Sequence, residues 1–183
     1  MEKRFENNSL IHTPKVIVIT GAESTGKSTL TEQLAHYFKV PCIPELARNY
    51  IENLGRKYNY SDVEKIAISQ VEQFGNYRDS NHPYIFLDTW LIVTKIWFEV
   101  VFKKEPAWLT DEIQNTSIDL FLVCNIDLPW IPDPVRENGG KMREILHLRY
   151  LEAISKFNFN YKIISGKDQN RFKQALLCLS ELQ

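Results

Sequence analysis

The sequence predicts an α/β domain built on a doubly wound parallel sheet. Short β-branched segments alternate with amphipathic helical segments along the chain, and a glycine-containing loop joins the first strand to the first helix. The length of 183 residues and the hydrophobic fraction of 44% suit one such domain with a buried core. We expect residues 1–14 to form an N-terminal tail and residues 15–183 to form a single domain.

Five strands are predicted from short apolar runs bounded by polar or turn residues. The first is a β-branched run, typical of a strand buried on both faces. Asp88 follows the last apolar residue of the third. The predicted strands are residues 15–20, 40–43, 84–87, 118–124 and 161–165.

Helices are predicted between these strands. The first carries apolar residues at intervals of four, and Gly55 ends the second. Ser61 and Glu64 have the spacing of a capping box that opens the third, and Asp168 is the predicted cap of the last. The predicted helices are residues 28–38, 45–54, 61–77, 89–102, 141–156 and 169–182, with a short one after Thr110.

Composition excludes several classes of partner. The chain has 22 Lys and Arg against 23 Asp and Glu, so it lacks the basic excess of a nucleic-acid-binding domain. Its three cysteines are widely spaced and form no C-x-x-C pair, which indicates buried thiols in a reducing compartment. Charges interrupt the longest apolar stretch, residues 84–102, so we expect no membrane span. These observations favour a cytoplasmic protein.

The octet from Gly21 to Ser28 has the pattern G-x-x-x-x-G-K-[ST] between a strand and a helix. Gly21 and Gly26 let the backbone turn its amides toward an anion. Lys27 supplies an ammonium for the β- and γ-phosphates, and the Ser28 hydroxyl is a candidate magnesium ligand. The predicted nucleotide-binding residues are Gly21, Glu23, Ser24, Thr25, Gly26, Lys27, Ser28 and Thr29.

Two acidic residues follow strands whose carboxyl ends should meet the phosphate loop. Glu45 comes after the second strand, where its carboxylate is either a general base or only a helix-opening residue. Asp88 comes after the third and is a candidate magnesium-binding residue, a second candidate base, or an N-cap. The residues do not decide between Glu45 and Asp88 as the base. Arg48, one turn after Glu45, either pairs with it or contacts substrate.

Residues 129–149 have the character of a lid. Prolines and the pair Gly139–Gly140 bound a segment that carries several arginines. An arginine brought in by closure would stabilise the charge on a transferring phosphoryl group, and Arg136 and Arg143 are the candidates. The alternative is a solvated basic helix face.

The motif set favours a small-molecule kinase. The guanine signature Asn-Lys-x-Asp is absent after the fourth strand, which argues against a GTPase. The predicted reaction uses ATP and Mg²⁺ with a small nucleoside-like substrate. The alternative is an ATP-binding regulatory switch that acts through a protein partner. The helix around Trp97 is then a candidate interface, and homodimerisation through it is an open alternative in either case.

Several segments together resemble the NadR-like AAA-type P-loop ATPases, relatives of the ribosylnicotinamide kinase domain of NadR. The segments are residues 21–30, 44–48, 86–89, 127–130 and 136–137, and the resemblance extends from about Lys15 to the C-terminus. It implies a three-layer P-loop fold like that of nucleoside and nucleotide kinases, with strand order 2-3-1-4-5. It also implies ATP and Mg²⁺ as co-substrates, with Lys27 and Ser28 as the matching phosphate and magnesium residues and Asp88 as the matching acidic residue after the third strand. The implied reaction is phosphorylation of a ribosyl 5′-hydroxyl, with nicotinamide riboside as the first candidate.

The chain departs from that family at two positions near the expected acceptor. Pro44 stands where the family has an aromatic residue, and Trp90 stands where it has a second Asp. In addition, the residues before the first strand are too few for the adenylyltransferase domain that precedes the kinase domain in NadR. Phosphate chemistry is therefore better supported by the residues than the identity of the acceptor.

Overall fold

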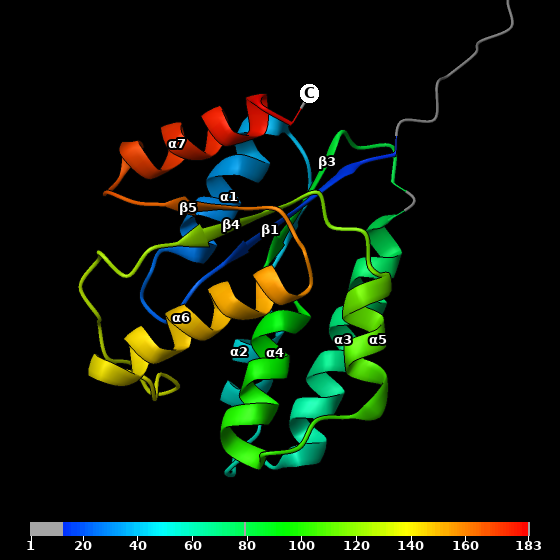
Figure 1. Cartoon of the computed structure of the whole chain (residues 1–183), viewed down its shortest axis with the longest axis vertical. Helices are drawn as coiled ribbons and strands as arrows, with labels where there is room; N and C mark the ends of the chain where they lie inside the picture. The colour runs from blue at the N-terminus through cyan, green and yellow to red at the C-terminus, as the bar shows by residue number, and fades with distance from the viewer. Residues whose placement is uncertain (1–12, 79, 183) are drawn as a thin grey trace, which may run out of the picture.

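The computed structural model describes residues 13–78 and 80–182, and its centre is a five-stranded parallel sheet. The strand order is β2-β3-β1-β4-β5, which confirms the expected α/β class and the order 2-3-1-4-5 (Figure 1). All four neighbouring pairs are parallel. The strands are β1 (Lys15–Thr20), β2 (Cys42–Ile43), β3 (Tyr84–Asp88), β4 (Leu120–Cys124) and β5 (Tyr161–Ile164).

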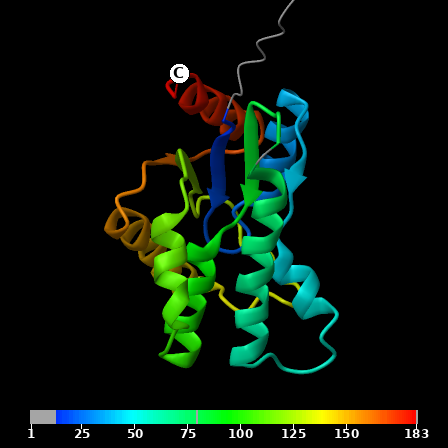
Figure 2. The ribbon, with the colours of Figure 1, turned by 90° about the vertical axis from the view of Figure 1, so that its right-hand side faces the viewer.

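Helices cover both faces of the sheet and make three layers. One face carries α1 (Lys27–Phe38) and α7 (Gln169–Ser180) (Figure 1). The other face carries α3 (Tyr60–Arg78), α4 (Leu91–Trp97), α5 (Ala107–Asn115) and α6 (Gly140–Lys156). Figure 2 shows α3, α4 and α5 extending side by side beyond the sheet. The remaining elements are α2 (Leu46–Glu52) and a π-helical turn, η1 (Phe98–Phe102).

The central strand divides its side chains between two apolar cores. Val16 and Val18 pack with α3, α4, α5 and α6, whereas Ile17 and Ile19 pack with α1 and α7. The alternation follows from the two-residue period of a strand, and burial on both faces is typical of a parallel sheet. Because the strands are parallel, all their carboxyl ends lie at one edge, where the loops that carry the functional residues begin.

The third helix begins earlier than predicted, because a different pair of residues forms its capping box. The Asp62 amide donates to Asn59 Oδ1 at 3.1 Å, and the Asn59 amide donates to Asp62 Oδ2 at 2.8 Å. Ser61 and Glu64 therefore do not cap α3. Arg56 also donates to both Asp62 oxygens, and the Tyr50 hydroxyl donates to one of them. These contacts hold the pKa of Asp62 well below its usual range and tie α2 to α3.

The apolar segment after β3 is not one continuous α-helix. Thr89 has φ 68°, a left-handed conformation that is unusual for a β-branched residue, and α4 begins only at Leu91. From Phe98 onward the helix changes to the π-helical turn η1. Asp168 likewise forms no side-chain cap of α7, although that helix does begin at Gln169.

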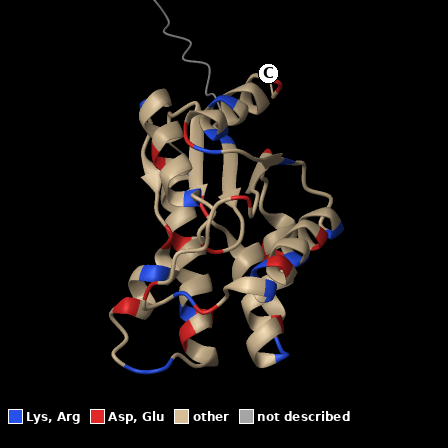
Figure 3. Ribbon diagram, turned by 90° about the vertical axis from the view of Figure 1, so that its left-hand side faces the viewer, with Lys and Arg blue, Asp and Glu red and all other residues tan. Residues whose placement is uncertain are grey.

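Other expectations concern the surface and the chain ends. Most of the tail expected over residues 1–14 lies outside the described residues. No helix in the described part of the chain is long and apolar enough to cross a membrane. Charges of both signs are mixed over the face in Figure 3, in line with the near-neutral composition. Of the three cysteines expected to be buried, only Cys124 is, and burial raises its pKa to about 11, whereas Cys42 and Cys178 are partly exposed.

Candidate active site

The loop between β1 and α1 has the conformation that its glycines allow. Gly21 has φ 141°, and a Cβ atom there would lie 2.7 Å from the carbonyl oxygen of Cys124. Gly26 has φ 76° and immediately precedes α1. Larger residues would be strained at both positions, and at Gly21 the side chain would also collide with β4. The structure thus requires both glycines of the octet.

Side chains inside the loop hold its turn. Thr25 is fully buried, and its hydroxyl donates to the Ala22 carbonyl at 2.8 Å. The ammonium of Lys27 donates to the same carbonyl at 3.1 Å. Lys27 therefore lies across the loop opening at the N-terminus of α1, where the helix dipole also favours an anion.

A cavity of about 400 Å³ extends from this loop. It contains the predicted loop residues Gly21, Glu23, Ser24, Thr25, Gly26, Lys27, Ser28 and Thr29. It continues past Glu45, which precedes α2, and Arg48 of α2 to side chains of α3, α4 and α6. The segment from Pro134 to Asn138 forms part of its wall. The structure therefore joins the phosphate loop and side chains of α2, α3, α4 and α6 in one space.

The two candidate acidic residues occupy different environments. Glu45 lines the cavity and, although it precedes α2, makes no side-chain cap. Asp88 is only 5% exposed, and burial raises its pKa from the ordinary 3.8 to about 6. The Ser28 hydroxyl and the Lys27 ammonium oppose this rise, whereas Glu45 adds to it. Asp88 does not cap the following helix, since α4 begins three residues later.

The residues around Ser28 fit a magnesium ion of the kind that accompanies a nucleoside triphosphate. Asp88 Oδ1 is buried and has no hydrogen-bond partner among the described residues, and Ser28 lies close enough to lower the pKa of Asp88. The described residues contain no group of three or more His, Cys, Asp or Glu side chains able to hold a metal ion alone. Phosphate and water oxygens would therefore supply the remaining ligands, as is usual for Mg²⁺.

The far end of the cavity combines aromatic rings with one oriented amide. The Thr94 hydroxyl donates to Gln70 Oε1 at 2.7 Å in a buried pair, so the amide nitrogen of Gln70 is the group left for a ligand. Tyr58 and Trp97 pack edge to face with ring centroids 4.9 Å apart. Both rings line the cavity. Thr94 and Trp97 are three residues apart on α4 and so share one face of the helix. This spacing could have identified both as lining residues from the sequence, but it was not used.

The segment after β4 packs over the cavity through ionic contacts. The Asp133 carboxylate forms ion pairs with Arg48 at 3.0 Å and with Arg136 at 2.9 Å. The Arg136 guanidinium also donates to the Ile131 carbonyl at 2.6 Å. Arg48 thus pairs with Asp133 and Glu52, not with Glu45. Arg136 lines the cavity, but its present partners belong to its own segment.

Glu23 of the phosphate loop anchors this segment from the other side. Its carboxylate accepts from Trp130 Nε1 at 3.2 Å and from the Asn138 amide nitrogen Nδ2 at 2.9 Å. The backbone amides of Glu137 and Asn138 donate to it at 3.2 and 3.0 Å. Motif position predicts Glu23 as a nucleotide-binding residue, and in the structure its side chain holds the neighbouring segment.

Arg143 lies behind the loop, with all three of its hydrogen bonds directed to carbonyl oxygens. It donates to Glu23 O at 2.9 Å, Leu128 O at 2.8 Å and Ser24 O at 3.0 Å. Its side chain is buried at 7% exposure, so it does not belong to a solvated helix face. The predicted placement of Arg143 over the phosphates is not seen. Trp90 is also outside the cavity, packed against Phe74 in the core.

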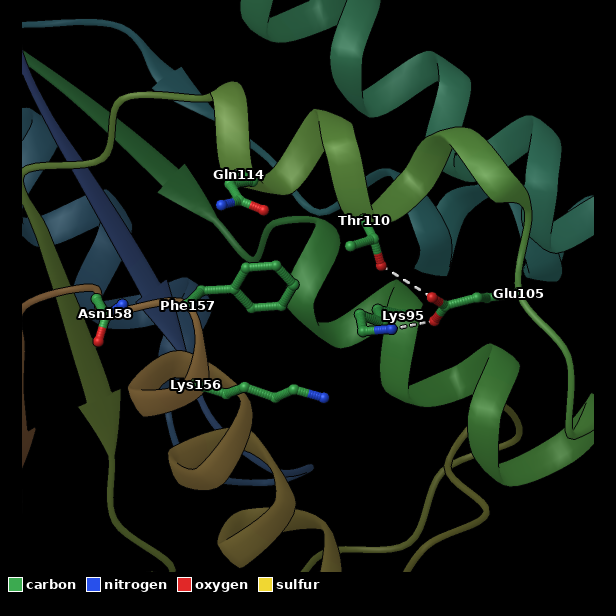
Figure 4. Close-up of a pocket in the computed structure, with 7 residues that line it drawn as sticks. All are labelled: Lys95, Glu105, Thr110, Gln114, Lys156, Phe157 and Asn158. Atoms are coloured by element: carbon green, nitrogen blue, oxygen red, sulfur yellow. Dashed lines mark hydrogen bonds and ion pairs between the residues drawn. The ribbon is translucent and has the colours of Figure 1, made fainter.

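A second cavity of about 400 Å³ lies between α4, α5 and the end of α6. Figure 4 shows Lys95 directed at Glu105, which also accepts from the Thr110 hydroxyl at 2.8 Å. Glu99 pairs with the same ammonium at 3.1 Å. Lys95 is therefore neutralised by its own neighbours, and the contacts join α4 to the start of α5.

The strand–loop–helix geometry, the open anion-binding turn and the acidic residue at the end of β3 define a P-loop nucleotide-binding protein. The family model described as "AAA domain" matches residues 16–171. The chain belongs to this AAA domain family.

Two proteins of known function are similar to this chain along most of its length. The chain is 25% identical over 174 residues to the trifunctional NAD biosynthesis/regulator protein NadR of Salmonella typhimurium, and equally to that of Escherichia coli. The match covers 92% of this chain but only 42% of each relative. The chain thus spans about two fifths of the length of these relatives, and it is similar to one part of them.

Solved structures share the fold. A crystal structure of NadR in complex with NR superposes with a TM-score of 0.77 at 24% identity, covering 93% of this chain and 51% of that one. Thymidylate kinase from Ehrlichia chaffeensis gives 0.64 at 14% identity, covering 93% and 99%. Deoxyadenosine kinase from M. mycoides with bound dCTP gives 0.60 at 14%, covering 91% and 99%.

Proposed function

We propose that this chain is an ATP- and Mg²⁺-dependent kinase that phosphorylates a hydroxyl group of a small ribosylated molecule, with nicotinamide riboside as the first candidate acceptor. The observation that carries the proposal is the single cavity that connects the phosphate loop, a carboxylate and an aromatic, amide-bearing end. A phosphoryl donor and an acceptor hydroxyl need this continuity, because phosphoryl transfer requires the two reactants to be aligned.

The donor half of the site consists of the loop, Lys27 and Ser28. Backbone amides and the α1 N-terminus surround the β- and γ-phosphates, and the Lys27 ammonium moves from the Ala22 carbonyl to phosphate oxygens. Ser28 and Asp88 would hold the Mg²⁺ that accompanies ATP, and the bound ion would supply positive charge to neutralise the transferring phosphoryl group. Asp88 must be ionised for this, and its pKa of about 6 allows that at neutral pH.

The acceptor half favours Glu45 over Asp88 as the general base. Glu45 lines the open cavity beside the loop, whereas Asp88 is buried behind Ser28. A base needs hydrogen-bond access to the hydroxyl whose proton it removes. Glu45 therefore accepts the acceptor proton. Residues 129–149 act as the lid, and Arg136 turns from Asp133 to the transferring phosphoryl group when the substrates are bound.

The ribosyl acceptor is suggested by the far end of the cavity together with the relatives. Tyr58 and Trp97 present ring faces and edges to a planar group, and the Gln70 amide can donate to a carbonyl oxygen. The curated relatives are named for NAD biosynthesis, and the NadR crystal structure is a complex with NR. Both support nicotinamide riboside ahead of other ribosides.

The test is acceptor-dependent ADP formation. The protein is incubated with ATP, Mg²⁺ and, separately, nicotinamide riboside, adenosine, deoxyadenosine, thymidine or no acceptor, and the phosphorylated product is identified by mass spectrometry. We expect one riboside to raise ADP production well above the acceptor-free rate, and Lys27→Ala to abolish it. If none does, the kinase proposal fails, and slow hydrolysis with tight ATP binding would favour the regulatory switch instead.

A further inference from the structure

Arg143 occupies an unusual position for a buried cation. Its guanidinium lies beneath the phosphate loop, and its Nε, Nη1 and Nη2 groups all donate to main-chain carbonyls. Two of these carbonyls, those of Glu23 and Ser24, belong to the loop, and the third belongs to Leu128, which immediately precedes the lid segment. A charged donor forms shorter and stronger hydrogen bonds than a neutral one, so these contacts hold the loop firmly from behind.

The direction of the loop amides follows from the planarity of the peptide bond. The carbonyl of Glu23 and the amide of Ser24 form one peptide unit and point in opposite directions, as do the carbonyl of Ser24 and the amide of Thr25. Because Arg143 draws both carbonyls toward α6, the two amides are turned to the opposite side. Ser24 and Thr25 both line the cavity, so that side is where the phosphates would bind.

The backbone at Ser24 needs such support. Its φ of 57° lies in the left-handed region, which costs free energy for any residue with a Cβ atom. An alternation of right- and left-handed residues is what makes a concave nest of amides for an anion. The hydrogen bond from Arg143 Nη2 to the Ser24 carbonyl oxygen, at 3.0 Å, stabilises this conformation. The guanidinium also places a positive charge beneath the nest.

We propose that Arg143 is a positioning residue for nucleotide binding: it holds the phosphate loop in its anion-binding conformation from behind and does not touch the nucleotide. This inference rests only on the nucleotide-binding half of the proposed function. It differs from the role of a lid arginine, which would contact the γ-phosphate. The two roles are separable because ADP lacks the γ-phosphate but still needs the loop.

Arg171 is a matched control. It is also buried, at 4% exposure, and it donates to the carbonyls of Gly166, Ile164 and Asn125 and to Asp127. None of these partners belongs to the phosphate loop. Arg149 lies on the same helix as Arg143 but is exposed, so it controls for the loss of one positive charge.

The experiment measures the Kd of ADP and of ATP with Mg²⁺ by calorimetry, together with the thermal midpoint. The proteins are wild type, Arg143→Met, Arg143→Lys, Arg171→Met and Arg149→Met. We expect Arg143→Met to weaken ADP and ATP binding alike, by about tenfold or more. Arg143→Lys keeps the charge but not the planar fork, so an intermediate loss is expected. Arg171→Met should lower the thermal midpoint with Kd unchanged, and Arg149→Met should change neither.

Several results would overturn the inference. If Arg143→Met binds ADP with the affinity of wild type, the loop does not depend on Arg143. A fall in kcat with unchanged ADP affinity would make Arg143 a direct contact to the transferring group. If Arg143→Met does not fold, Arg143→Lys decides by the same criterion. A wild type that binds nucleotide without phosphorylating any acceptor refutes only the kinase proposal, whereas a wild type that binds no nucleotide refutes both.

Discussion

The two carboxylates near the phosphate loop differ in what surrounds them, and this difference makes their roles separable. Glu45 lines the cavity, and Asp88 is buried beside Ser28. We expect Glu45→Gln to lower kcat by about 10²-fold or more with the Mg²⁺ dependence unchanged, because it removes a base. Asp88→Asn should instead raise the Mg²⁺ concentration needed for half-maximal rate. Rates measured over a magnesium titration test both, and the reverse pattern would exchange the two roles.

The buried carboxyl group of Asp88 should make the stability of the protein depend on pH. Burial raises its pKa from 3.8 to about 6, so the folded protein binds this proton more tightly than the unfolded chain does. Stability from this group is therefore greatest below about pH 4 and is lost as the pH rises to about 6. At pH 7.5 the nucleotide-free Asp88→Asn variant should be more stable than wild type, by at most about 3 kcal/mol.

Urea unfolding of the nucleotide-free proteins at pH 4 and pH 7.5 measures this effect. Asp111→Asn, an exposed substitution on α5, is the control and should change stability little at either pH. The difference between Asp88→Asn and wild type should shrink at pH 4. An Asp88→Asn protein that is no more stable than wild type at pH 7.5 would contradict the cost assigned to the buried charge.

Gln70 tests the acceptor end of the cavity. Its amide is oriented by the Thr94 hydroxyl, so replacing it removes a donor already directed at the ligand. We expect Gln70→Leu to raise the KM for the acceptor by about tenfold and to leave the KM for ATP unchanged. Gln73→Leu on the same helix lies outside the cavity lining and serves as the control. A change in both KM values, or in neither, would remove Gln70 from acceptor recognition.

At the scale of helices and strands, the sequence predicted those features that depend on residues close together in the chain. The octet needed no information beyond its own spacing, and parallel strands brought Glu45 and Asp88 to the same edge. The predicted start of the third helix was wrong because two residue pairs, Ser61–Glu64 and Asn59–Asp62, both have the spacing of a capping box. Tertiary contacts decide between them, since Arg56 and Tyr50 both donate to Asp62.

Contacts distant in sequence account for the features that were missed. Nothing near Arg143 in the sequence shows that its partners are carbonyls 119 and 120 residues away. A basic residue in a glycine-bounded segment is typical both of a lid and of a buried clamp. No glycine or proline within η1 indicates the change from α4 to the π-helical turn at Phe98. Both features depend on packing between distant parts of the chain, which the periodicity of the sequence does not reveal.

The capping box of α3 can be tested directly. Asn59→Ala removes the side-chain oxygen that accepts from the Asp62 amide, which should destabilise the protein by about 1 kcal/mol. Ser61→Ala, at the position that the sequence pattern favours, should have little effect because Ser61 makes no cap. Urea unfolding midpoints measure the stability of the two variants. A larger loss of stability in Ser61→Ala than in Asn59→Ala would favour the predicted Ser61–Glu64 capping box instead.

On the scale of the whole molecule, the cavity is closed by parts of the chain that are distant in sequence. Glu23 of the phosphate loop holds Trp130 and Asn138, and Arg48 of α2 holds Asp133. The Tyr58 hydroxyl donates to Glu137 at 3.1 Å, which adds the loop before α3. The segment over the cavity is thus fastened to both the proposed donor side and the proposed acceptor side, so its position depends on both.

This arrangement predicts that Glu23 limits the loss of phosphoryl groups to water. Glu23→Ala removes the carboxylate that holds Trp130 and Asn138, while the Glu23 carbonyl stays bound to Arg143. A looser lid admits water to the γ-phosphate, so the ratio of ADP formed to acceptor phosphorylated should rise severalfold. Glu144→Ala, an exposed substitution on α6, is the control and should keep the wild-type ratio. An unchanged ratio in Glu23→Ala would show that this contact does not exclude water.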